Sequence, residues 1–381
     1  MKCKLADVAD ITMGQSPKSE YYNSKGDGIP FLQGNRTFGR RYPIFDTYTT
    51  FTTKIAKAGD VIMSVRAPVG DLNIAPVDMC LGRGVCGIKM KNGNNDFLFY
   101  LLKYYMPQLI NKETGTVFGS VNKNDINGLE IDIPKEETVQ KKIAHYLSLI
   151  DDKIEENEKI NKNLEQQIQT IYLNFVAKYK TSTKTVKEIT LAANTGADAI
   201  QKAPIVDYDT GIRCIRVGDM SNKRPLHEWG FVKVSPKIFK QYQLHKNDIV
   251  ITRTASLGLN RIINRDIKAV YNNGLIRISI NSDIILPLIV YCQFQTNDYY
   301  NYIQRISGET SVRPNMKIEY LLKYSFEVLD KTIQEKLIQV IQPMFEVFEQ
   351  NIIENHKLSK LKDNLLPKLM SGELDVSNID F

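Results

Sequence analysis

Two patterns of apolar and polar residues recur along the chain, and each is present twice. The run GDVIMSVRAPVG (59–70) has an apolar stretch that ends in a proline and a glycine, which predicts a strand leading into a tight turn. The run NDIVITRTASLG (247–258) repeats the apolar stretch, the small hydroxyl residue and the closing glycine at an offset of 188. Three further pairs keep the same order at offsets of 183, 191 and 193, namely IPFLQGN (29–35) with IRCIRVGD (212–219), FLFYLL (97–102) with LIVYCQ (288–293), and Gly115 with Gly308. The sequence therefore predicts two related globular copies that arose by duplication.

A long heptad pattern follows each copy, over residues 137–175 and 331–370. Apolar residues spaced alternately by 4 and 3 positions predict two long helices with a coiled-coil seam. Asparagine interrupts both seams at matching places, and because a seam asparagine fixes register, we expect the two helices to pair with each other. The alternative is that each helix only caps its own globular copy. The predicted seam residues are Ile143, Leu147, Ile150, Ile154, Asn157, Asn161 and Leu164 in the first helix, and Leu337, Ile341, Met344, Phe348, Asn351, Asn355 and Leu358 in the second.

Three features distinguish the second helix from the first. Pro343 stands where the first helix has a leucine, which predicts a kink, because proline removes a helical hydrogen bond. Lys362 takes the seam place that Ile168 holds in the first helix, which predicts a weak position. Thr332 and Glu335 have the spacing of a capping box, which predicts the start of the second helix.

Composition limits what these copies can be. With 381 residues, 43% hydrophobic and 24% charged, the chain has the composition of a globular protein with more than one domain. It has no apolar run of membrane-spanning length and no apolar signal-peptide core at its start, so we expect a cytoplasmic protein without a membrane segment. The five cysteines are scattered and form no CxxC pair, so we expect reduced packing residues and no metal site.

Positive charge is concentrated in the globular copies. Lysine and arginine minus aspartate and glutamate give +4 for residues 1–135 and +6 for 184–330, against −1 for 136–183 and −2 for 331–381. Two basic domains and two helices without excess positive charge are typical of a nucleic-acid binder with a spacer, although solvated surfaces can have similar balances.

Arginine, asparagine and glutamine gather in corresponding parts of the two copies. QGNRTFGRRY (33–42) is too polar for a core strand and too irregular for a helix, and RVGDMSNKRP (216–225) is its counterpart. Arginine reads guanine and asparagine or glutamine reads adenine in the major groove, so these clusters are candidate DNA-reading loops. A solvated surface is the alternative for each single residue. The candidate DNA-binding residues are Gln33, Asn35, Arg36, Arg40, Arg41, Arg66, Asn122 and Lys123 in the first copy, and Arg216, Asn222, Lys223, Arg224, Arg253, Arg313 and Asn315 in the second.

Motifs of catalysis are missing from the sequence. GRGVCG (82–87) fits the glycine spacing of a dinucleotide site, but no helical pattern follows it, and we interpret it as a turn. The sequence has no P-loop and no methyltransferase or common nuclease motif, and its four histidines form no cluster. We therefore expect no catalytic residue, no metal and no cofactor in this chain.

The chain resembles the specificity subunit of Type I restriction–modification systems. The resemblance rests on GDVIMSVRAPVG, on TVQKKIAHYLSLIDDKIEENEKINKNLE (138–165) and on LLPKLMSGEL (365–374), and it extends over essentially the whole chain. It implies a mixed α/β (α+β) fold with two target recognition domains and two helices that form an antiparallel coiled coil. The implied domains are 1–135 and 184–330 for target recognition, and 136–183 and 331–381 for the helical spacers.

The resemblance also implies partners and a mode of action. Each target recognition domain would read one half of a bipartite, asymmetric site in double-stranded DNA. Two methyltransferase subunits carrying S-adenosylmethionine would dock on the helices, and restriction subunits using ATP and Mg would join them. Two alternatives come from other classes: a coiled-coil DNA-binding scaffold or regulator without a methyltransferase, and a self-sufficient modification enzyme.

Overall fold

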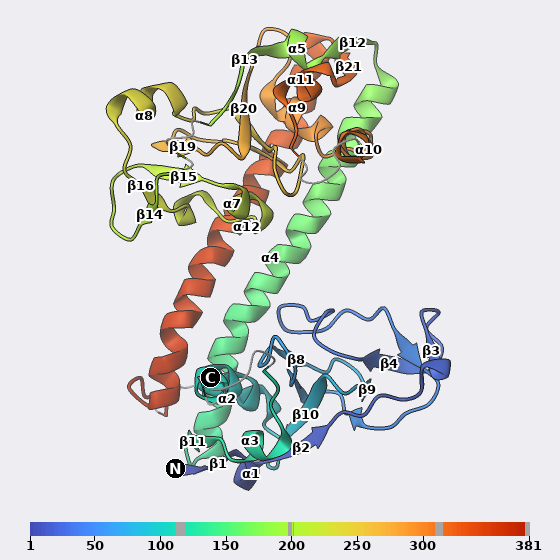
Figure 1. Ribbon diagram of the computed structural model, residues 1–381, viewed down its shortest axis with the longest axis vertical. Helices are drawn as coiled ribbons and strands as arrows, with labels where there is room; N and C mark the ends of the chain where they lie inside the picture. Colours follow the sequence, from blue (N-terminus) through green and yellow to red (C-terminus); the bar gives the residue numbers. More distant parts are fainter. Residues whose placement is uncertain (112–118, 197–199, 201, 309–314, 378–381) are drawn as a thin grey trace. The chain divides into compact units, whose positions relative to one another are not determined.

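The computed structural model describes residues 1–381 except 112–118, 197–199, 201, 309–314 and 378–381, so Gly115 and Arg313 lie outside the described residues. The chain divides into two compact units (Figure 1). The first unit combines Met1–Ile154 with Lys357–Phe381, and the second is Glu155–His356. Each long helix contributes to both units. The four-part division expected from the sequence, at 135, 183 and 330, stays a proposal.

The described residues of the first unit form three sheets. Its two-stranded sheet pairs β1 (Lys2–Lys4) with β11 (Glu130–Asp132), and its four-stranded sheet has the order β2, β10, β7, β8. A five-stranded sheet has the order β3, β5, β4, β9, β6, in which β4 and β9 are parallel. The bounds are β2 Ala9–Met13, β3 Tyr22–Asn23, β4 Ile29–Leu32, β5 Tyr48–Thr49, β6 Ile55–Ala56, β7 Val61–Ser64, β8 Leu72–Ile74, β9 Met79–Leu81 and β10 Val85–Met90, with helices α1 Leu5–Val8, α2 Asn95–Asn111 and α3 Lys123–Asn127 and the 3-10 turn η1 Ser19–Tyr21.

The described residues of the second unit repeat this arrangement with one strand fewer in the third sheet. β12 (Thr181–Thr185) pairs with β21 (Ser325–Leu329), a four-stranded sheet has the order β13, β20, β17, β18, and a third sheet has the order β14, β16, β15, β19 with β15 and β19 parallel. The bounds are β13 Thr190–Thr195, β14 Ile205–Val206, β15 Arg213–Ile215, β16 Phe231–Val232, β17 Ile249–Thr252, β18 Asn260–Ile262, β19 Ala269–Tyr271 and β20 Leu275–Ile280, with α5 Val186–Ile189, α7 Val217–Ser221, the 3-10 turn η2 Leu226–Glu228, α8 Pro236–Tyr242, α9 Pro287–Gln293, α10 Asn297–Gly308 and α11 Ile318–Lys323. The mixed α/β class with two related globular parts is thereby confirmed.

The two long helices are α4 (Glu137–Lys178) and α12 (Lys331–Ser371). In the first unit Asp151 of α4 contacts Lys362 of α12, and in the second unit Asn157 and Asn161 contact Asn355 and Asn351. Within the second unit the partner number falls as the α4 number rises, so the helices run antiparallel. The predicted antiparallel helix pair is confirmed.

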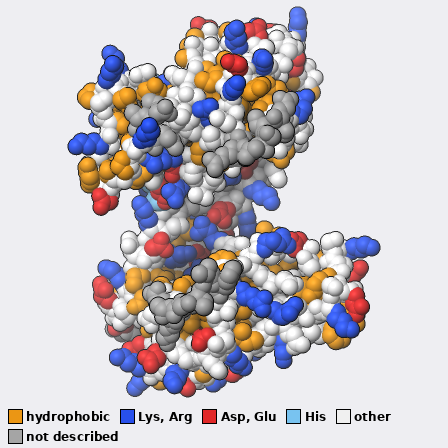
Figure 2. Space-filling view, in the orientation of Figure 1, with side chains coloured by type: hydrophobic (Ala, Val, Ile, Leu, Met, Phe, Trp, Pro, Cys, Tyr) orange, Lys and Arg blue, Asp and Glu red, His pale blue; other side chains and the backbone are white. Residues whose placement is uncertain are grey.

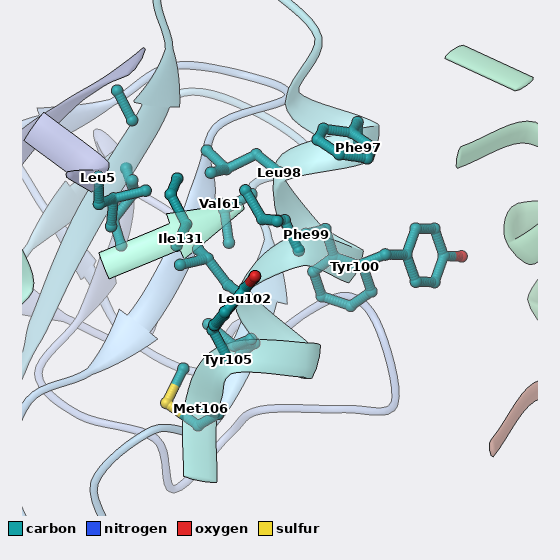
Figure 3. Packing of buried hydrophobic residues seen from close by; sticks show 14 of the residues in the cluster. Leu5, Val61, Phe97, Leu98, Phe99, Tyr100, Leu102, Tyr105, Met106 and Ile131 are labelled. Carbon is teal, nitrogen blue, oxygen red and sulfur yellow. The ribbon is translucent and has the colours of Figure 1, made fainter. Parts of the chain in front are cut away.

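Both units build their cores against these helices. In the first unit, α2 and the four-stranded sheet pack with α4 and α12, through residues such as Leu147 and Leu369. Figure 3 shows part of this core, in which Leu98 and Phe99 of α2 lie near Val61 of β7 and Ile131 of β11. In the second unit the equivalent core contains Tyr172 of α4 and Ile341 of α12. Each globular copy therefore packs on the beginning of one long helix and the end of the other.

Three local expectations need correction or detail. Helix α12 begins at Lys331, and Asp330 accepts the first backbone hydrogen bonds from Ile333 and Gln334, so the expected Thr332–Glu335 capping box lies inside the helix. Helix α12 continues through Pro343 to Ser371, so the proline does not end the helix, and the kink expected there stays a prediction. The counterpart of the first irregular loop contains the short helix α7, because Asp219 accepts a hydrogen bond from the backbone N–H of Arg216 and caps it.

Two other properties concern the described residues as a whole. The five cysteines are all free, and four of them are buried. In the described part of the chain, no helix combines the length and the apolar character needed to cross a membrane.

Candidate nucleic-acid interface

The duplicated strand and turn have the same hydrogen bonds in both units. Ser64 accepts a backbone hydrogen bond from Gly70 at 3.0 Å, and Thr252 accepts the equivalent bond from Gly258 at 3.0 Å. The two closing glycines have φ of +91° and +79°, a left-handed conformation that costs a glycine little. Side chains of α2 and α10 also lie close to these glycines, so a Cβ would meet Met106 or Ile303. The turn is therefore a rigid element on which neighbouring polar residues are placed.

Residues of the first loop gather around this turn. Asn35 donates to Asp71 at 2.6 Å and to the carbonyl of Pro68 at 3.4 Å, while the backbone carbonyl of Gln33 accepts from Gly84. Arg66 is exposed in the turn itself and pairs through its backbone with Ser120. The structure thus brings Gln33, Asn35 and Arg66 to one region of the first unit.

The arginines of this loop have three different environments. Arg36 is exposed and forms an ion pair with Asp46 at 2.6 Å. Arg40 is exposed, but Arg41 is only 8% exposed and pairs with Asp152 of helix α4. Arg41 could contact a base only if its ion pair with Asp152 opened, so DNA reading by Arg41 stays a prediction. The ion pair itself joins the loop to helix α4.

The corresponding residues of the second unit also divide into paired and exposed side chains. Arg216 donates to the carbonyl of Ala203 at 2.7 Å and Arg224 pairs with Asp219 at 3.3 Å, while Asn222 and Lys223 are exposed after α7. Lys223 has a positive φ of 49° and lines a cavity of about 310 Å³ that also touches the second turn.

The remaining candidates are divided between structural and exposed positions. Asn122 caps helix α3 by accepting from the backbone of Asn124 at 2.8 Å, and its neighbour Lys123 is exposed. Arg253 donates to Met316 and Asn273 and so fixes the second turn, while Asn315 is exposed and forms a bridge with Thr254. The offset of 188 pairs position 66 with Thr254, and both residues form an isolated backbone bridge, so Arg66 and Arg253 occupy different places in the two turns. DNA contact by each of these residues stays a prediction.

The asparagines of the helix seam contact one another across the pair. Asn157 donates to Asn355 at 2.8 Å and to Glu354 at 2.8 Å, and Asn351 donates to Asn161 at 2.8 Å. By the duplication offset of 194, Asn157 corresponds to Asn351 and Asn161 to Asn355. Each contact joins one member of both corresponding pairs, so the two contacts are related by pseudo-two-fold symmetry. Buried amides need such partners, and a shift of register would separate them. All other predicted seam residues are buried or half-buried: Ile143, Leu147, Ile150, Ile154, Leu164, Leu337, Ile341, Met344, Phe348 and Leu358.

Sequence reasoning missed a polar cluster beside the seam in the first unit. The carboxylate of Asp151, 1% exposed, pairs with Lys362 and accepts a hydrogen bond from Tyr100 at 2.8 Å. Burial alone would raise the pKa of Asp151, but Lys362 and the Tyr100 hydroxyl outweigh burial and hold that pKa below its usual range. Lys362 is therefore a paired charge, and the expectation of a weak position in the seam stays a prediction. The lysine in an apolar seam was the signal that an acidic partner was needed.

No group of three or more histidine, cysteine, aspartate or glutamate side chains suitable for a metal occurs among the residues that the structure describes. Lysine and arginine are spread over the visible face of each unit, among acidic and apolar side chains (Figure 2). The candidate interface therefore consists of polar and basic side chains on rigid turns and loops, an arrangement suited to binding.

Comparisons with known proteins point to one family. Residues 1–166 match the model of the Type I restriction modification DNA specificity domain. The putative type I restriction enzyme MjaX specificity subunit of Methanocaldococcus jannaschii is 42% identical over 177 residues, covering 46% of this chain and 41% of that protein. The type I restriction enzyme MjaIX specificity subunit of the same organism is 24% identical over 411 residues, covering 99% of this chain and 94% of that protein. The crystal structure of the S subunit of a Type-I restriction-modification system from M. genitalium has 16% identity and a TM-score of 0.66, covering 97% of this chain and 96% of that one, which shows a shared fold.

Proposed function

This chain belongs to the specificity-subunit family of Type I restriction–modification systems, and we propose that each of its two globular copies reads one half of a split DNA site. As the DNA specificity subunit, it is the non-catalytic component that selects the sequence. The proposal rests on the repeated globular fold. Both copies contain the same strand and turn, but different polar residues surround the turn in each copy. Because the surrounding loops differ, the two half-sites would differ, and the whole site would be asymmetric.

The helix pair supports a role as spacer and docking element. Its register is fixed by the two asparagine pairs, and both cores pack on it. We propose that two methyltransferase subunits carrying S-adenosylmethionine dock on this chain, and that restriction subunits using ATP and Mg complete the complex. We further propose that the complex acts in the cytoplasm. The family assignment argues against a scaffold that works without a methyltransferase.

The proposed function is tested by expression with its methyltransferase. Copurification of a stable complex is expected, and mapping of methylated adenines in a host with and without this chain should give one motif with two different half-sites and a fixed gap. A free oligomer that does not bind a methyltransferase, or a methylation pattern unchanged by the chain, would contradict the proposal.

The reading loops allow a more local prediction. Replacing exposed Arg40 or Arg224 with alanine should weaken binding to the specific site by ~1–3 kcal/mol, which is the worth of a good arginine–base pair. The change should affect the half-site of that unit alone, as measured by binding to duplexes with single substitutions in each half. Lys25→Ala is the control for loss of one exposed charge. Equal affinity and unchanged half-site preference in Arg40→Ala and Arg224→Ala would remove these residues from the interface.

A further inference from the structure

The GRGVCG motif (82–87) contains the tight connection between β9 and β10. Residues 82–84 join these two strands, so the turn expected from the sequence is confirmed. Arg83 stands between the two glycines of this turn, and its side chain is exposed. Among the residues that the structure describes, none forms a hydrogen bond or an ion pair with the Arg83 guanidinium. The turn therefore presents a guanidinium that the fold itself does not use.

The turn packs closely on the backbone of the first loop. The N–H of Gly84 donates to the carbonyl of Gln33 at 3.0 Å, and the N–H of Gly82 donates to the carbonyl of Leu32 at 2.7 Å. A Cβ added to Gly82 would lie 2.7 Å from the Cα of Gln33, and one added to Gly84 would lie 2.4 Å from the Gln33 carbonyl oxygen. Both distances are too short for a real Cβ, so only glycine allows this approach. Arg83 is thereby fixed beside the backbone of Gln33, whose side chain is also exposed.

The same turn is also joined to the duplicated strand and turn of the first unit. The N–H of Val65 donates to the carbonyl of Gly84 at 2.9 Å. Arg66 follows directly along the chain, and its side chain is exposed. Gln33, Arg66 and Arg83 therefore extend from three backbone segments that are hydrogen-bonded to one another.

The second unit repeats these backbone contacts with other side chains. At an offset of 190, Asn273 takes the place of Arg83, in the connection between β19 and β20. The N–H of Arg253 donates to the carbonyl of Gly274 at 2.9 Å, which matches the bond to Gly84 in the first unit. The guanidinium of Arg253 donates to the side-chain oxygen of Asn273 at 3.2 Å. The turn thus forms without an arginine at this place, and its side chains differ between the two units.

We propose that Arg83 is a specificity-determining residue of the first copy and reads a guanine in the half-site of that copy. This inference rests on the proposed function and adds one residue to its reading surface. A guanidinium offers two donors that match the two acceptors of guanine in the major groove. Base reading needs a fixed position, and the contacts of Gly82 and Gly84 fix the backbone on both sides of Arg83. A phosphate can be bound by charge alone, so the two kinds of contact respond differently when the charge is kept and the planar guanidinium is removed.

Arg83→Lys makes this change, and the complex with the methyltransferase is used to measure its effect. Affinity for the specific duplex should fall about 5- to 150-fold, the factor that corresponds to one bidentate base contact. Affinity for an unrelated duplex and the slope of log affinity against log salt should change little, because the charge remains. Lys4→Gln removes an exposed lysine of β1 in the same unit and is the control, which should leave the preference for the specific duplex unchanged.

Arg83→Asn gives this turn the residue that the second unit has at the same place. The unfolding temperature should stay unchanged, because the second unit forms the equivalent backbone bonds with asparagine. Mapping of methylated adenines should show a first half-site that no longer distinguishes one G·C pair from other base pairs. The second half-site and the gap should be the same as in the unchanged protein.

Three results would overturn the reading role of Arg83. The first is an unchanged affinity and motif in both variants. The second is an equal loss on specific and unrelated duplexes in Arg83→Asn, with a salt slope reduced by about 0.9 and full affinity in Arg83→Lys, which would identify a phosphate contact instead. The third is an altered second half-site. A methyltransferase complex without any sequence preference in the unchanged protein would overturn the proposed function, and this inference with it.

Discussion

Removing one heptad from each long helix should shorten the gap between the two half-sites and leave both half-site sequences unchanged. The deletion takes residues 158–164 from α4 and 348–354 from α12, which face each other through the Asn161–Asn351 contact. The Asn157–Asn355 contact remains, so register is kept. Seven residues correspond to ~10 Å of helix, or about 3 base pairs if helix and duplex are parallel and fewer if they are inclined. Mapping of methylated adenines measures the gap.

Two further variants show whether the helix pair acts as the spacer. Deleting three or four residues from α4 alone turns the apolar seam away from α12, and this variant should fail to assemble with the methyltransferase. Adding one heptad to each helix should lengthen the gap by as much as the deletion shortens it. A heptad variant that methylates DNA with the original gap, or with altered half-site bases, would mean that the helices do not set the spacing.

Lys362→Ala is expected to cost about 3–5 kcal/mol of the free energy of unfolding, because it leaves Asp151 buried without its charge partner. Replacing both residues by those of the second unit, Asp151→Phe with Lys362→Ile, should restore stability to at least the original value. Lys368→Ala is the control, since this lysine of the same helix is exposed and pairs with Glu373 at 3.5 Å; it should cost ~0–1 kcal/mol. Chemical denaturation of the three variants measures the differences, and a small effect of Lys362→Ala would show that Asp151 finds another partner.

Lowering the pH should reduce the difference in the free energy of unfolding between Lys362→Ala and the unchanged protein. The pKa of Asp151 lies below its usual range, so the pair contributes stability above the unfolded value of about 4 and loses it as pH falls through the folded pKa. In Lys362→Ala, burial without the lysine should raise the pKa of Asp151, and protonation then relieves the cost. The two denaturation midpoints should therefore converge as pH is lowered from 7 toward 4.

The parts of the fold that could be predicted from sequence are those with a long or repeated pattern. Helix α4 spans 42 residues and α12 spans 41, so many seam positions indicated the same periodicity. The asparagines added register, and the structure joins Asn157 to Asn355 and Asn161 to Asn351. The repeated strand and turn were equally visible, because a glycine with positive φ closes both copies.

The candidate site was less predictable, because contacts across the fold decide which charges are exposed. Arg41 lies in a polar, irregular loop and has the appearance of a surface residue, yet it is buried against Asp152, which is 111 positions away. Lys362 could be recognised as unusual in the seam, but its partner Asp151 lies beside the seam of the other helix. A sequence pattern predicts which face of a helix is buried, but it does not predict which residue of the other helix contacts that face.

Residues from the C-terminal part of the chain complete the core of the first unit, so this core can form only late in synthesis. Its core includes Leu369, Met370 and Val376, and Lys142 donates to the carbonyl of Ser377, 235 positions further along the chain, at 2.6 Å. At ~5–20 residues per second, the ribosome needs on the order of 10–50 s to make the intervening chain. For that time the sheets and α2 of the first unit lack part of their apolar cover, and a nascent chain in this state is exposed to aggregation and to chaperones. The N-terminal copy therefore completes its folding only after the C-terminal copy has been synthesised.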